Sequence, residues 1–492
     1  MTYSEAIAAK NPDSPNTSEW KLEKLTPIQK FYSGSKILVT GGTGFIGHVL
    51  LEKLLTACPN ISKIYLIIRR KKDTDIEARL DRMFEDIVFS RLKKQCPDFR
   101  DKIIAVEGDM LLPGLGISPS DRLLLIKEVN VIFHSAATIR FDEPLRRAVL
   151  INIRAVRDMV RLAHEMPNLK SFIHLSTAYS NCIHQHIMEE IYPPAADYRK
   201  LLQVVESPLP DNILEKITPM LIGKYPNTYS YSKQIGEAII MEEGKGLPIG
   251  IHRPSIVMGT YEEPIRGWIN SFYTPTGYLA LIGIGVIRTT ENILELKPSL
   301  IPVDMVVNSV IATACNVAER YGEQQKQKDI LVYNYENTDT SALNWADSKK
   351  LAMRYFRLYP LVTDMWYPFC INCKTHTGYV IASFFVHKLP AILVDAVLFC
   401  LRKPVMVVKA YKKIDKFTRL LSHFMVNEWT FESNNTRSVI NSMSEEDRKL
   451  FPCDPRNFDW EKYIERFVIG YRIYLFKDPM DTLPQARKRL RR

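Results

Sequence analysis

Short apolar runs alternate with longer amphipathic stretches along the first two thirds of the chain. From Lys36 onward, β-branched runs such as "KILVT", "KIYLII" and "KSFIHLS" are separated by helix-like stretches such as "LRRAVLINIRAVRDMVRLAHEM". The apolar runs are continuous, which is typical of parallel strands that are buried on both faces. This alternation predicts right-handed βαβ units and an α/β fold with a doubly wound, parallel, Rossmann-type sheet, expected over residues 34–345.

The rhythm changes at four places. Residues 1–33 carry Pro, Ser and Asn without periodicity and are expected to form a flexible lead-in. Residues 182–224 hold several prolines and acidic residues, so we expect an insertion near the mouth of the sheet. Beyond about residue 340 the alternation fades and the chain is rich in aromatic residues up to about residue 475. Residues 476–492 form a basic tail.

One apolar stretch, Thr377–Leu401, is long enough to span a bilayer. His387, Lys388, Pro390 and Asp395 interrupt it. A charge at the centre of a membrane helix costs roughly 2.5–3.5 kcal/mol. Two interpretations stay open: a membrane-embedded or interfacial hairpin, and an apolar docking surface or pair of buried helices.

The composition is that of a folded, intracellular chain. Hydrophobic residues make up 46% and aromatic residues 10% of the 492 residues, which is enough for a large buried core and excludes a disordered chain. The eight cysteines are spread thinly, so we expect a reducing compartment and no disulfide framework. The N-terminal segment lacks the basic and apolar regions of a secretory signal.

The net charge of +11 has an excess of cations at the end of the chain, in "RKRLRR". Such a tail binds nucleic acid, attracts anionic lipid, or is simply solvated. No nucleic-acid recognition module accompanies it, so no nucleic-acid partner is expected. No metal site is expected either. Cys370 and Cys373 form one CxxC without a second pair, and His184 and His186 lie near Cys182 without a matching partner.

A glycine-rich turn, Gly41-x-x-Gly44-x-x-Gly47, follows the first predicted strand and opens a predicted helix. Glycine adopts the positive φ that a tight turn needs, and it has no Cβ to keep a pyrophosphate away from the backbone. The amides at a helix N-terminus then favour the phosphate charge. The turn therefore predicts a dinucleotide site.

The second predicted strand ends in four cations, Arg69, Arg70, Lys71 and Lys72. Enzymes that use NAD usually place an acid here, whereas cations suit the 2′-phosphate of NADP, so we expect NADPH. The alternative is a solvated charge run. Asp109 follows the third strand, where an acid can accept from the adenine amine, although Gly-Asp is also a common turn.

A tyrosine and a lysine, Tyr229 and Lys233, are spaced so that both lie on one face of a helix. A nearby ammonium is expected to lower the pKa of the phenol by stabilising phenolate, which makes the pair a general acid for a carbonyl oxygen that receives a proton. Thr177 is the first choice, and Ser176 the second, for a hydroxyl that orients this carbonyl. Asn152 is a candidate anchor for the water chain that returns the proton to the lysine.

These motifs together resemble a known family. "TGGTGFIG", "HSAAT", "INIRAV", "HLSTAYSN", "YSYSK" and "HRPSIVMG" occur in the order found in extended short-chain dehydrogenases/reductases. "VTGGTGFIG", "STAYSN", "PNTYSYSK" and "YLFKDPMDTLPQARK" resemble, more narrowly, eukaryotic and particularly insect-like fatty acyl-CoA reductases. The resemblance covers about residues 33–490.

The resemblance implies NADPH-dependent, two-step reduction of a long-chain acyl-CoA to a primary alcohol, with release of CoA. It also implies a C-terminal domain at about residues 360–475, which we expect to be mainly helical. By the match, Tyr229 is the proton donor, Lys233 its partner, and Thr177 or Ser176 the carbonyl-orienting residue. The expected cofactor contacts, besides that pair, are Thr40, Gly41, Gly44, Phe45, Ile46, Gly47, Arg69, Arg70, Asp109, Ala136 and Pro254.

Two departures qualify the match. The interval between Thr177 and Tyr229 is longer than in simple members of the superfamily, but acyl-CoA reductases carry an insertion there. Many members continue past "LPQARK" into a hydrophobic anchor, whereas this sequence ends at Arg492. We expect an intracellular, membrane-associated enzyme, in the endoplasmic reticulum or peroxisome. The alternatives are another extended dehydrogenase/reductase, acting on a sterol or other lipid alcohol or ketone, and a catalytically inactive cofactor-binding scaffold.

Overall fold

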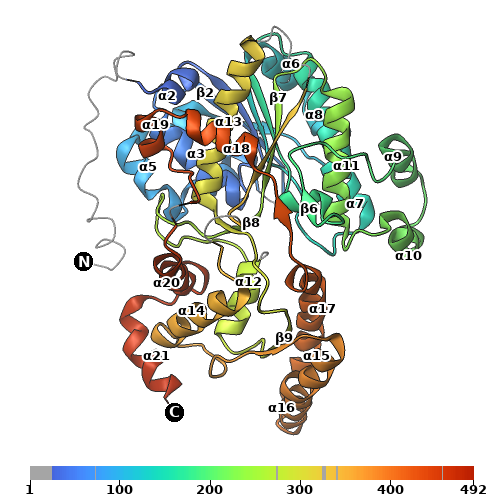
Figure 1. Ribbon diagram of the computed structural model, residues 1–492, viewed down its shortest axis with the longest axis vertical. Coiled ribbons are helices and arrows are strands. Elements are labelled where there is room, and N and C mark those ends of the chain that lie inside the picture. Colours follow the sequence, from blue (N-terminus) through green and yellow to red (C-terminus); the bar gives the residue numbers. More distant parts are fainter. Residues whose placement is uncertain are drawn as a thin grey trace.

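The protein folds into an upper lobe built on a sheet and a lower, mostly helical lobe (Figure 1). The structure is a computed structural model, and it describes residues 25–71, 74–272, 275–323, 329–338, 342–456 and 458–491. The first 24 residues of the expected lead-in therefore lie outside the described part.

The upper lobe contains a seven-stranded parallel sheet in the order β11-β7-β5-β4-β1-β2-β3. The order reverses between β1 and β4, and ligands of such sheets bind at the carboxyl ends of the strands beside this reversal. The predicted fold class, a parallel Rossmann-type sheet, is confirmed. The strands are β1 (Lys36–Thr40), β2 (Lys63–Ile68), β3 (Ile103–Glu107), β4 (Val131–His134), β5 (Ser171–Leu175), β7 (Ile249–Pro254) and β11 (Leu331–Tyr335).

Helices cover both faces of the sheet, which explains why the strands are continuous apolar runs. Ile37 and Val39 of β1 belong to the core under α3 and α13, whereas Leu38 belongs to the core under α8 and α11. Figure 1 shows these pairs on opposite sides of the sheet. The helices of this lobe are α3 (Phe45–Ala57), α4 (Ile76–Phe84), α5 (Ser90–Gln95), α6 (Pro119–Glu128), α7 (Leu145–Val149), α8 (Ala155–His164), α11 (Thr228–Glu243) and α13 (Val303–Glu323).

The described end of the expected lead-in is not flexible coil, which corrects that part of the expectation. Helix α2 (Pro27–Tyr32) begins with a capping box, in which Thr26 and Gln29 bond to each other's backbone amides. Tyr32 is fully buried, and its hydroxyl donates to the carbonyl of Ile311 in α13 at 2.9 Å. These residues belong to the core of the upper lobe.

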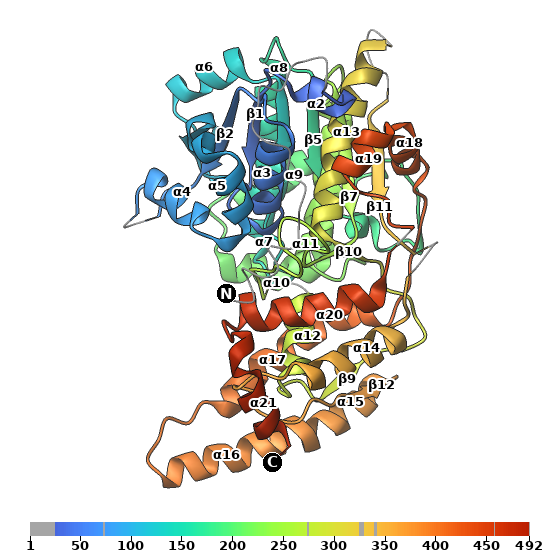
Figure 2. The same ribbon diagram turned by 90° about the vertical axis from the view of Figure 1, so that its left-hand side faces the viewer.

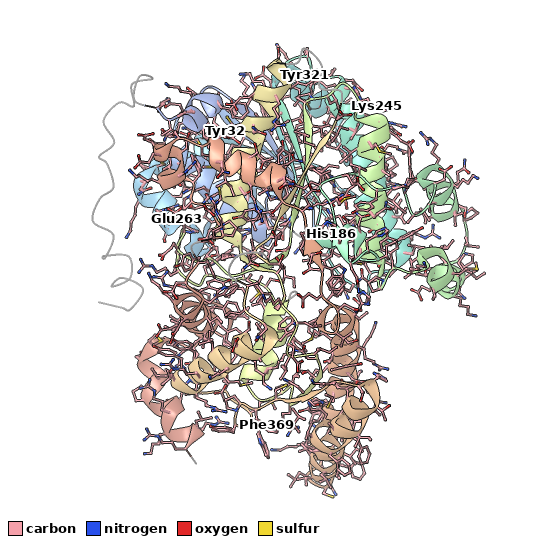
Figure 3. All side chains as sticks on the ribbon, in the orientation of Figure 1. Tyr32, His186, Lys245, Glu263, Tyr321 and Phe369 are labelled. Atoms are coloured by element: carbon pink, nitrogen blue, oxygen red, sulfur yellow. The ribbon has the colours of Figure 1, made fainter. Side chains whose placement is uncertain are left out.

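The expected insertion forms a short strand and two helices at the side of the upper lobe, α9 (Tyr198–Glu206) and α10 (Asp211–Ile222) (Figure 1). Its strand β6 (His186–Ile187) pairs with β13 (Thr430–Phe431), which lies far along the chain. Figure 3 shows His186 close to the junction of the two lobes. The insertion is therefore attached to the C-terminal part of the protein.

The lower lobe and the C-terminal segment are interleaved. Val439 and Ile440 of α18 pack in the same core as α13, so the chain returns to the upper lobe after about residue 430. Helix α12, which precedes α13, lies in the lower lobe (Figures 1 and 2). The lobes thus differ in extent from the expected segment 360–475.

The other elements complete the two lobes. They are β8 (Ile256–Met258), α12 (Pro275–Gly283), β9 (Thr289–Glu291), β10 (Leu300–Pro302), α14 (Trp345–Leu358), β12 (Ile371–Cys373), α15 (His376–Ser383), α16 (Leu389–Cys400), α17 (Val407–Met425), α18 (Asn434–Ser442), α19 (Glu445–Leu450), α20 (Trp460–Gly470) and α21 (Leu483–Leu490).

The basic C-terminal segment is docked and not a free tail over its described residues. Helix α21 buries Leu483 and Ala486. The guanidinium of Arg487 donates to the carbonyl of Leu358, at the end of α14, at 2.8 and 3.0 Å. Part of the terminal positive charge is thereby used to cap a helix C-terminus.

Candidate active site

The glycine-rich turn joins β1 to α3 at the reversal of the sheet. Gly41 has φ +73°, and a Cβ there would lie 2.7 Å from the amide nitrogen of Ala136. A Cβ on Gly47 would lie 2.3 Å from the carbonyl oxygen of Gly41, so glycine lets α3 begin directly against the turn. The N-cap of α3 is Gly44, which has no side chain to bond to the amides of the first helical turn, Phe45 and Ile46.

Thr40, the last residue of β1, links the glycine turn to the end of β4 by hydrogen bonds. Its buried hydroxyl lies 2.8 Å from Nδ1 of His134 and accepts from the amide of Ala136 at 3.1 Å. The Ser135 hydroxyl in turn donates to the Thr40 carbonyl at 2.7 Å. The structure thus gives Thr40 a bracing role between β1 and β4, and Ala136 lies beside the turn. Pro254 is buried at the end of β7.

The cations after β2 are exposed at the same edge of the sheet. The side chains of Arg69 and Arg70 extend into solvent, and the Arg70 guanidinium lies 3.9 Å from Glu107. Arg79 of α4 donates to the carbonyl of Arg69, and burial and the charge of Arg69 lower the pKa of Arg79. Arg79 was not singled out from the sequence, because it lies on the next helix and not in the cation run after the strand. Lys72 lies outside the described residues.

Asp109 is half-buried after β3. Its carboxylate accepts from the amide of Leu111 at 2.9 Å, and its backbone amide donates to the carbonyl of Leu115 at 2.8 Å. The side chain therefore holds a turn, which is the alternative that the sequence left open. The position beside β2 and β3 is also compatible with a contact to an adenine.

Tyr229 and Lys233 lie one turn apart on α11, whose N-cap Asn227 accepts from the amide of Ser230 at 2.8 Å. The Lys233 amine is buried and donates to the carbonyl of Leu175, at the end of β5, at 2.7 Å. Burial lowers the pKa of Lys233 to about 8, and the Glu237 carboxylate opposes this shift. The lysine is thus anchored to the carboxyl edge of the sheet.

The pKa of Tyr229 differs from the expectation. Burial raises it to about 12, a hydrogen bond with the Thr177 hydroxyl acts in the opposite direction, and the charge of Glu237 raises it further. The desolvation of the phenolate is therefore the largest influence on this pKa. The phenol is protonated at neutral pH and retains the proton that a general acid must supply.

The two neighbouring hydroxyls have different partners. The Thr177 hydroxyl lies beside the Tyr229 phenol, whose pKa it lowers, and accepts from the amide of Tyr179 at 3.3 Å. The Ser176 hydroxyl donates to the carboxylate of Glu237, which also receives two hydrogen bonds from Arg253, at 2.6 and 2.9 Å. The pair Glu237–Arg253 is fully buried. Glu237 follows Lys233 by one helical turn, a signal that sequence reasoning missed.

Asn152 lies on a π-helical turn, Leu150–Arg154. Its side-chain amide donates to the carbonyl of Thr138 at 3.1 Å and to the hydroxyl of Ser232 at 2.9 Å, and its side-chain oxygen accepts from the amide of Thr138 at 3.0 Å. A Cβ on Gly236 would lie 2.7 Å from the Asn152 carbonyl. Asn152 thus fixes helix α11, which carries Tyr229 and Lys233, against the loop after β4.

An aromatic cluster adjoins the candidate phenol through Phe141. The ring centroids of Phe141 and Tyr229 are 5.8 Å apart, and those of Phe141 and Phe424 are 5.2 Å apart. Tyr179 lies 5.4 Å from Phe424 and 5.3 Å from Trp429. Phe141 comes from the loop after β4, whereas Phe424 comes from α17. The phenol therefore lies where the two lobes meet. These long-range contacts leave no local pattern in the sequence.

Comparisons with known proteins agree with this geometry. A family profile described as "Male sterility protein" matches residues 39–310, and a second profile with that description matches residues 386–478. Fatty acyl-CoA reductase wat of Drosophila melanogaster is 36% identical over 467 residues, which cover 95% of this chain and 89% of that protein. Fatty acyl-CoA reductase 1 of Mus musculus is 36% identical over 469 residues, with the same coverage. The chain belongs to the fatty acyl-CoA reductase family.

Solved structures with the same fold include reductase domains of other enzymes. The reductase (R) domain of a nonribosomal peptide synthetase from Mycobacterium tuberculosis aligns with a TM-score of 0.58 and 17% identity, over 96% of this chain and 95% of that one. The terminal R domain of the myxalamid biosynthetic pathway aligns with a TM-score of 0.56 and 18% identity, over 91% and 93%. At this level of identity the likeness concerns the fold.

The residues of this fatty acyl-CoA reductase family member fit a nicotinamide dinucleotide. The positions of Gly41 and Gly47 exclude a Cβ, and the glycine N-cap leaves the start of α3 open to phosphate. Within the described residues, no group of three or more His, Cys, Asp and Glu side chains is arranged to hold a metal ion. Cys373 instead lies 3.6 Å from the Thr289 hydroxyl.

Proposed function

We propose that this member of the family reduces a long-chain fatty acyl-CoA to the primary alcohol, with NADPH as the reductant and CoA as the leaving group. The observation that carries the proposal is that Tyr229 lies one helical turn from the buried Lys233 and beside the Thr177 hydroxyl, which lowers its pKa, at the sheet edge that carries the glycine turn. The family assignment supports the substrate class, because the relatives are named fatty acyl-CoA reductases.

The reaction needs two hydride transfers and two protons. NADPH supplies hydride to the carbonyl carbon when it is bound. Tyr229 is protonated and donates its proton to the carbonyl oxygen, while Thr177 orients that oxygen and the Lys233 ammonium stabilises the phenolate that forms. The hemithioacetal then loses CoA as the thiol, because the proton of its hydroxyl goes to the leaving sulfur. Once the oxidised cofactor has been exchanged for a second NADPH and Tyr229 has been reprotonated, the aldehyde accepts a second hydride and a second proton at the same groups. Asn152 acts as a positioning residue for α11.

The exposed cations after β2 support NADPH over NADH. Arg69 and Arg70 lie at the carboxyl end of the second strand, where the ribose of the adenosine half binds in this fold. Guanidinium groups pair with a phosphate through charge-assisted hydrogen bonds. An acidic side chain that would bind a 2′-hydroxyl is not found at these two positions.

The aromatic cluster and one apolar helix support a lipid substrate. Phe141 and Phe424 place apolar surface beside Tyr229, where an acyl chain would lie. Within the described residues, His376–Cys400 is the one helix that is long and apolar enough, by length and composition, to cross a membrane. We therefore also propose that the protein associates with a membrane.

Product analysis tests the proposal. The purified protein is incubated with palmitoyl-CoA and NADPH, with an aldehyde trap in a parallel sample. The release of thiol together with hexadecanol supports the proposal, and trapped aldehyde reports the first half of the reaction. Oxidation of a hydroxysteroid without any reduction of acyl-CoA would support the alternative dehydrogenase and would overturn the proposal. A series of acyl-CoA lengths then defines the chain preference.

A further inference from the structure

One continuous helix, His376–Cys400, is made of α15, the π-helical turn Phe384–Lys388 and α16. Its polar side chains are mostly buried and its apolar side chains mostly exposed, the reverse of a helix in a soluble protein. Its buried positions recur every fourth residue and form one stripe. Most of this stripe is polar. The buried residues are Tyr379, Ser383, His387, Ala391 and Asp395.

The polar side chains of this stripe are hydrogen-bonded to groups inside the lower lobe. The Tyr379 hydroxyl donates to Asp415 at 2.9 Å, and His387 Nε2 accepts from the amide of Arg288 at 2.8 Å. The Asp395 carboxylate accepts from the amides of Val407 and Val408, at 2.9 and 2.8 Å, and so caps the start of α17. The polarity of these groups is therefore turned inward, and Lys388 is the one Lys, Arg, Asp or Glu side chain of the helix that is exposed.

The outer face of the helix is apolar and exposed along most of its length. Phe385 is 61% exposed, Leu393 59%, Val397 58% and Phe399 74%. Figure 2 shows α15 and α16 along the lower edge of the lower lobe, on the side away from the sheet. A helix of a soluble core has the opposite arrangement, with its apolar side inward. An exposed apolar face of this size indicates a binding surface.

An exposed aromatic segment lies beside Arg288, whose backbone amide donates to His387 of the helix. Met365, Trp366 and Tyr367 are all exposed, and Trp366 packs against the Arg288 guanidinium, 5.4 Å from its ring centroid. The segment continues to Phe369, which Figure 3 shows in the lower part of this lobe. Tryptophan and tyrosine are the residues that favour the headgroup level of a bilayer.

Cations border the same face. Arg402 and Lys403 follow α16, and α17 presents Lys409, Lys412 and Lys413 to solvent. The cations are next to the apolar face and not within it, which is the arrangement of helices that lie in the interface of an anionic membrane.

We propose that α15 and α16 lie flat in one leaflet of an anionic membrane and anchor the protein to its surface without crossing the bilayer. The polar stripe holds the helix along α17, so a crossing would carry the α17 lysines into hydrocarbon, where their charge is strongly disfavoured. The proposal specifies the mode of the membrane association proposed above and does not depend on the catalytic assignment.

The anchor is connected to the candidate active site by one helix. α17 begins at Val407, beside Asp395 of the anchor, and carries Phe424, which contacts Phe141 next to Tyr229. Lys416 in the same helix pairs with Asp142 of the loop that carries Phe141, at 3.0 Å. Helix α17 therefore connects the proposed membrane-facing surface to the loop that contacts Tyr229.

Vesicle flotation tests the surface. Full-length protein is mixed with phosphatidylcholine vesicles or with vesicles that also contain phosphatidylserine. We expect flotation with both and more with phosphatidylserine. The variant Leu393→Glu/Val397→Glu should weaken the binding about tenfold or more, because burying each of these side chains is worth more than such a factor. The matched control is Met220→Glu, since Met220 is 77% exposed on α10, and it should bind like the wild type.

Charge and orientation are tested separately. Lys409→Glu/Lys413→Glu should abolish the preference for phosphatidylserine. Lys374→Cys and Lys403→Cys mark the two ends of the helix and are made in a Cys400→Ser background. Both should react with a membrane-impermeant maleimide on intact vesicles. If one end reacts only after detergent is added, the helix spans the bilayer and the proposal is wrong.

The other outcomes also decide the question. If Leu393→Glu/Val397→Glu floats as well as the wild type, the proposal is wrong. It is also wrong if the wild type binds no vesicles but forms a dimer that this variant dissociates, because the apolar face would then be a contact between two copies of the chain. Acyl-CoA reduction in detergent is measured in parallel, and the variant should retain it. A protein that floats but does not reduce acyl-CoA contradicts the proposed function and leaves the anchor intact.

Discussion

The Thr177 hydroxyl lies beside the phenol of Tyr229 and lowers its pKa, whereas the adjacent Ser176 hydroxyl donates to the buried carboxylate of Glu237. The side chains of consecutive residues at the end of a strand point in different directions. The substitution Thr177→Val removes the hydroxyl and keeps the shape. We expect kcat to fall about tenfold to a hundredfold, the loss of one strong hydrogen bond in the transition state, as measured by NADPH oxidation at saturating acyl-CoA.

The conservative variant separates catalysis from stability. Thr177 also caps a short helix through the amide of Tyr179, so Thr177→Val should lower Tm slightly as well. Thr177→Ser retains the hydroxyl and should keep most of the activity. If Thr177→Val retains full kcat, another group orients the carbonyl.

Gly47 permits the close contact between α3 and the glycine turn. The substitution Gly47→Ala places a Cβ 2.3 Å from the carbonyl oxygen of Gly41, so the turn must shift. We expect NADPH binding, measured by fluorescence titration, to weaken at least about tenfold. The matched control is Gly322→Ala in α13, where a Cβ has no neighbour within 4 Å. It should bind NADPH normally and be as stable as the wild type or up to about 1 kcal/mol more stable. Equal binding by Gly47→Ala would contradict the phosphate site.

The exposed arginines after β2 should set the cofactor preference. The variant Arg69→Ala/Arg70→Ala loses the cations proposed to bind the 2′-phosphate, and each charge-assisted contact is worth about 1.5–3 kcal/mol. The KM for NADPH should therefore rise at least about tenfold while the KM for NADH stays the same. Steady-state kinetics with both cofactors measure this, and an equal change for NADH would indicate a role unrelated to the 2′-phosphate.

The pH profile should report Lys233. Burial lowers its pKa to about 8, so the amine is charged below that pH and neutral above it. The charge stabilises the phenolate that forms when Tyr229 gives up its proton. We therefore expect kcat to fall as the pH rises through about 8, measured at saturating NADPH and acyl-CoA. A kcat that stays constant or rises above pH 8 would contradict this role. Tyr229 itself, with a pKa of about 12, stays protonated throughout.

Local patterns in the sequence predicted the sheet and the glycine turn well. Continuous apolar runs such as Ile37–Val39 indicate strands buried on both faces, and they are buried under helices on both sides. The spacing of Tyr229 and Lys233 likewise placed both on one helix. Such features depend on neighbours within a few residues, so a sequence contains them directly.

The features that the sequence did not predict depend on long-range contacts. Phe424 lies beside Phe141 although they are far apart in the chain, and β13 pairs with β6 of the insertion. The pKa of Tyr229 depends on its burial, which spacing does not give. His387 and Asp395 interrupt an apolar run in the sequence, but the fold turns both toward internal partners.

The account depends most on Tyr229 as the proton donor, and the variant Tyr229→Phe tests it directly. Phenylalanine keeps the ring contact with Phe141 and removes only the hydroxyl. The measurement is alcohol formation from palmitoyl-CoA, with NADPH binding titrated on the same sample. We predict that alcohol formation is abolished while NADPH binds as in the wild type. Alcohol formation at the wild-type rate would contradict the account.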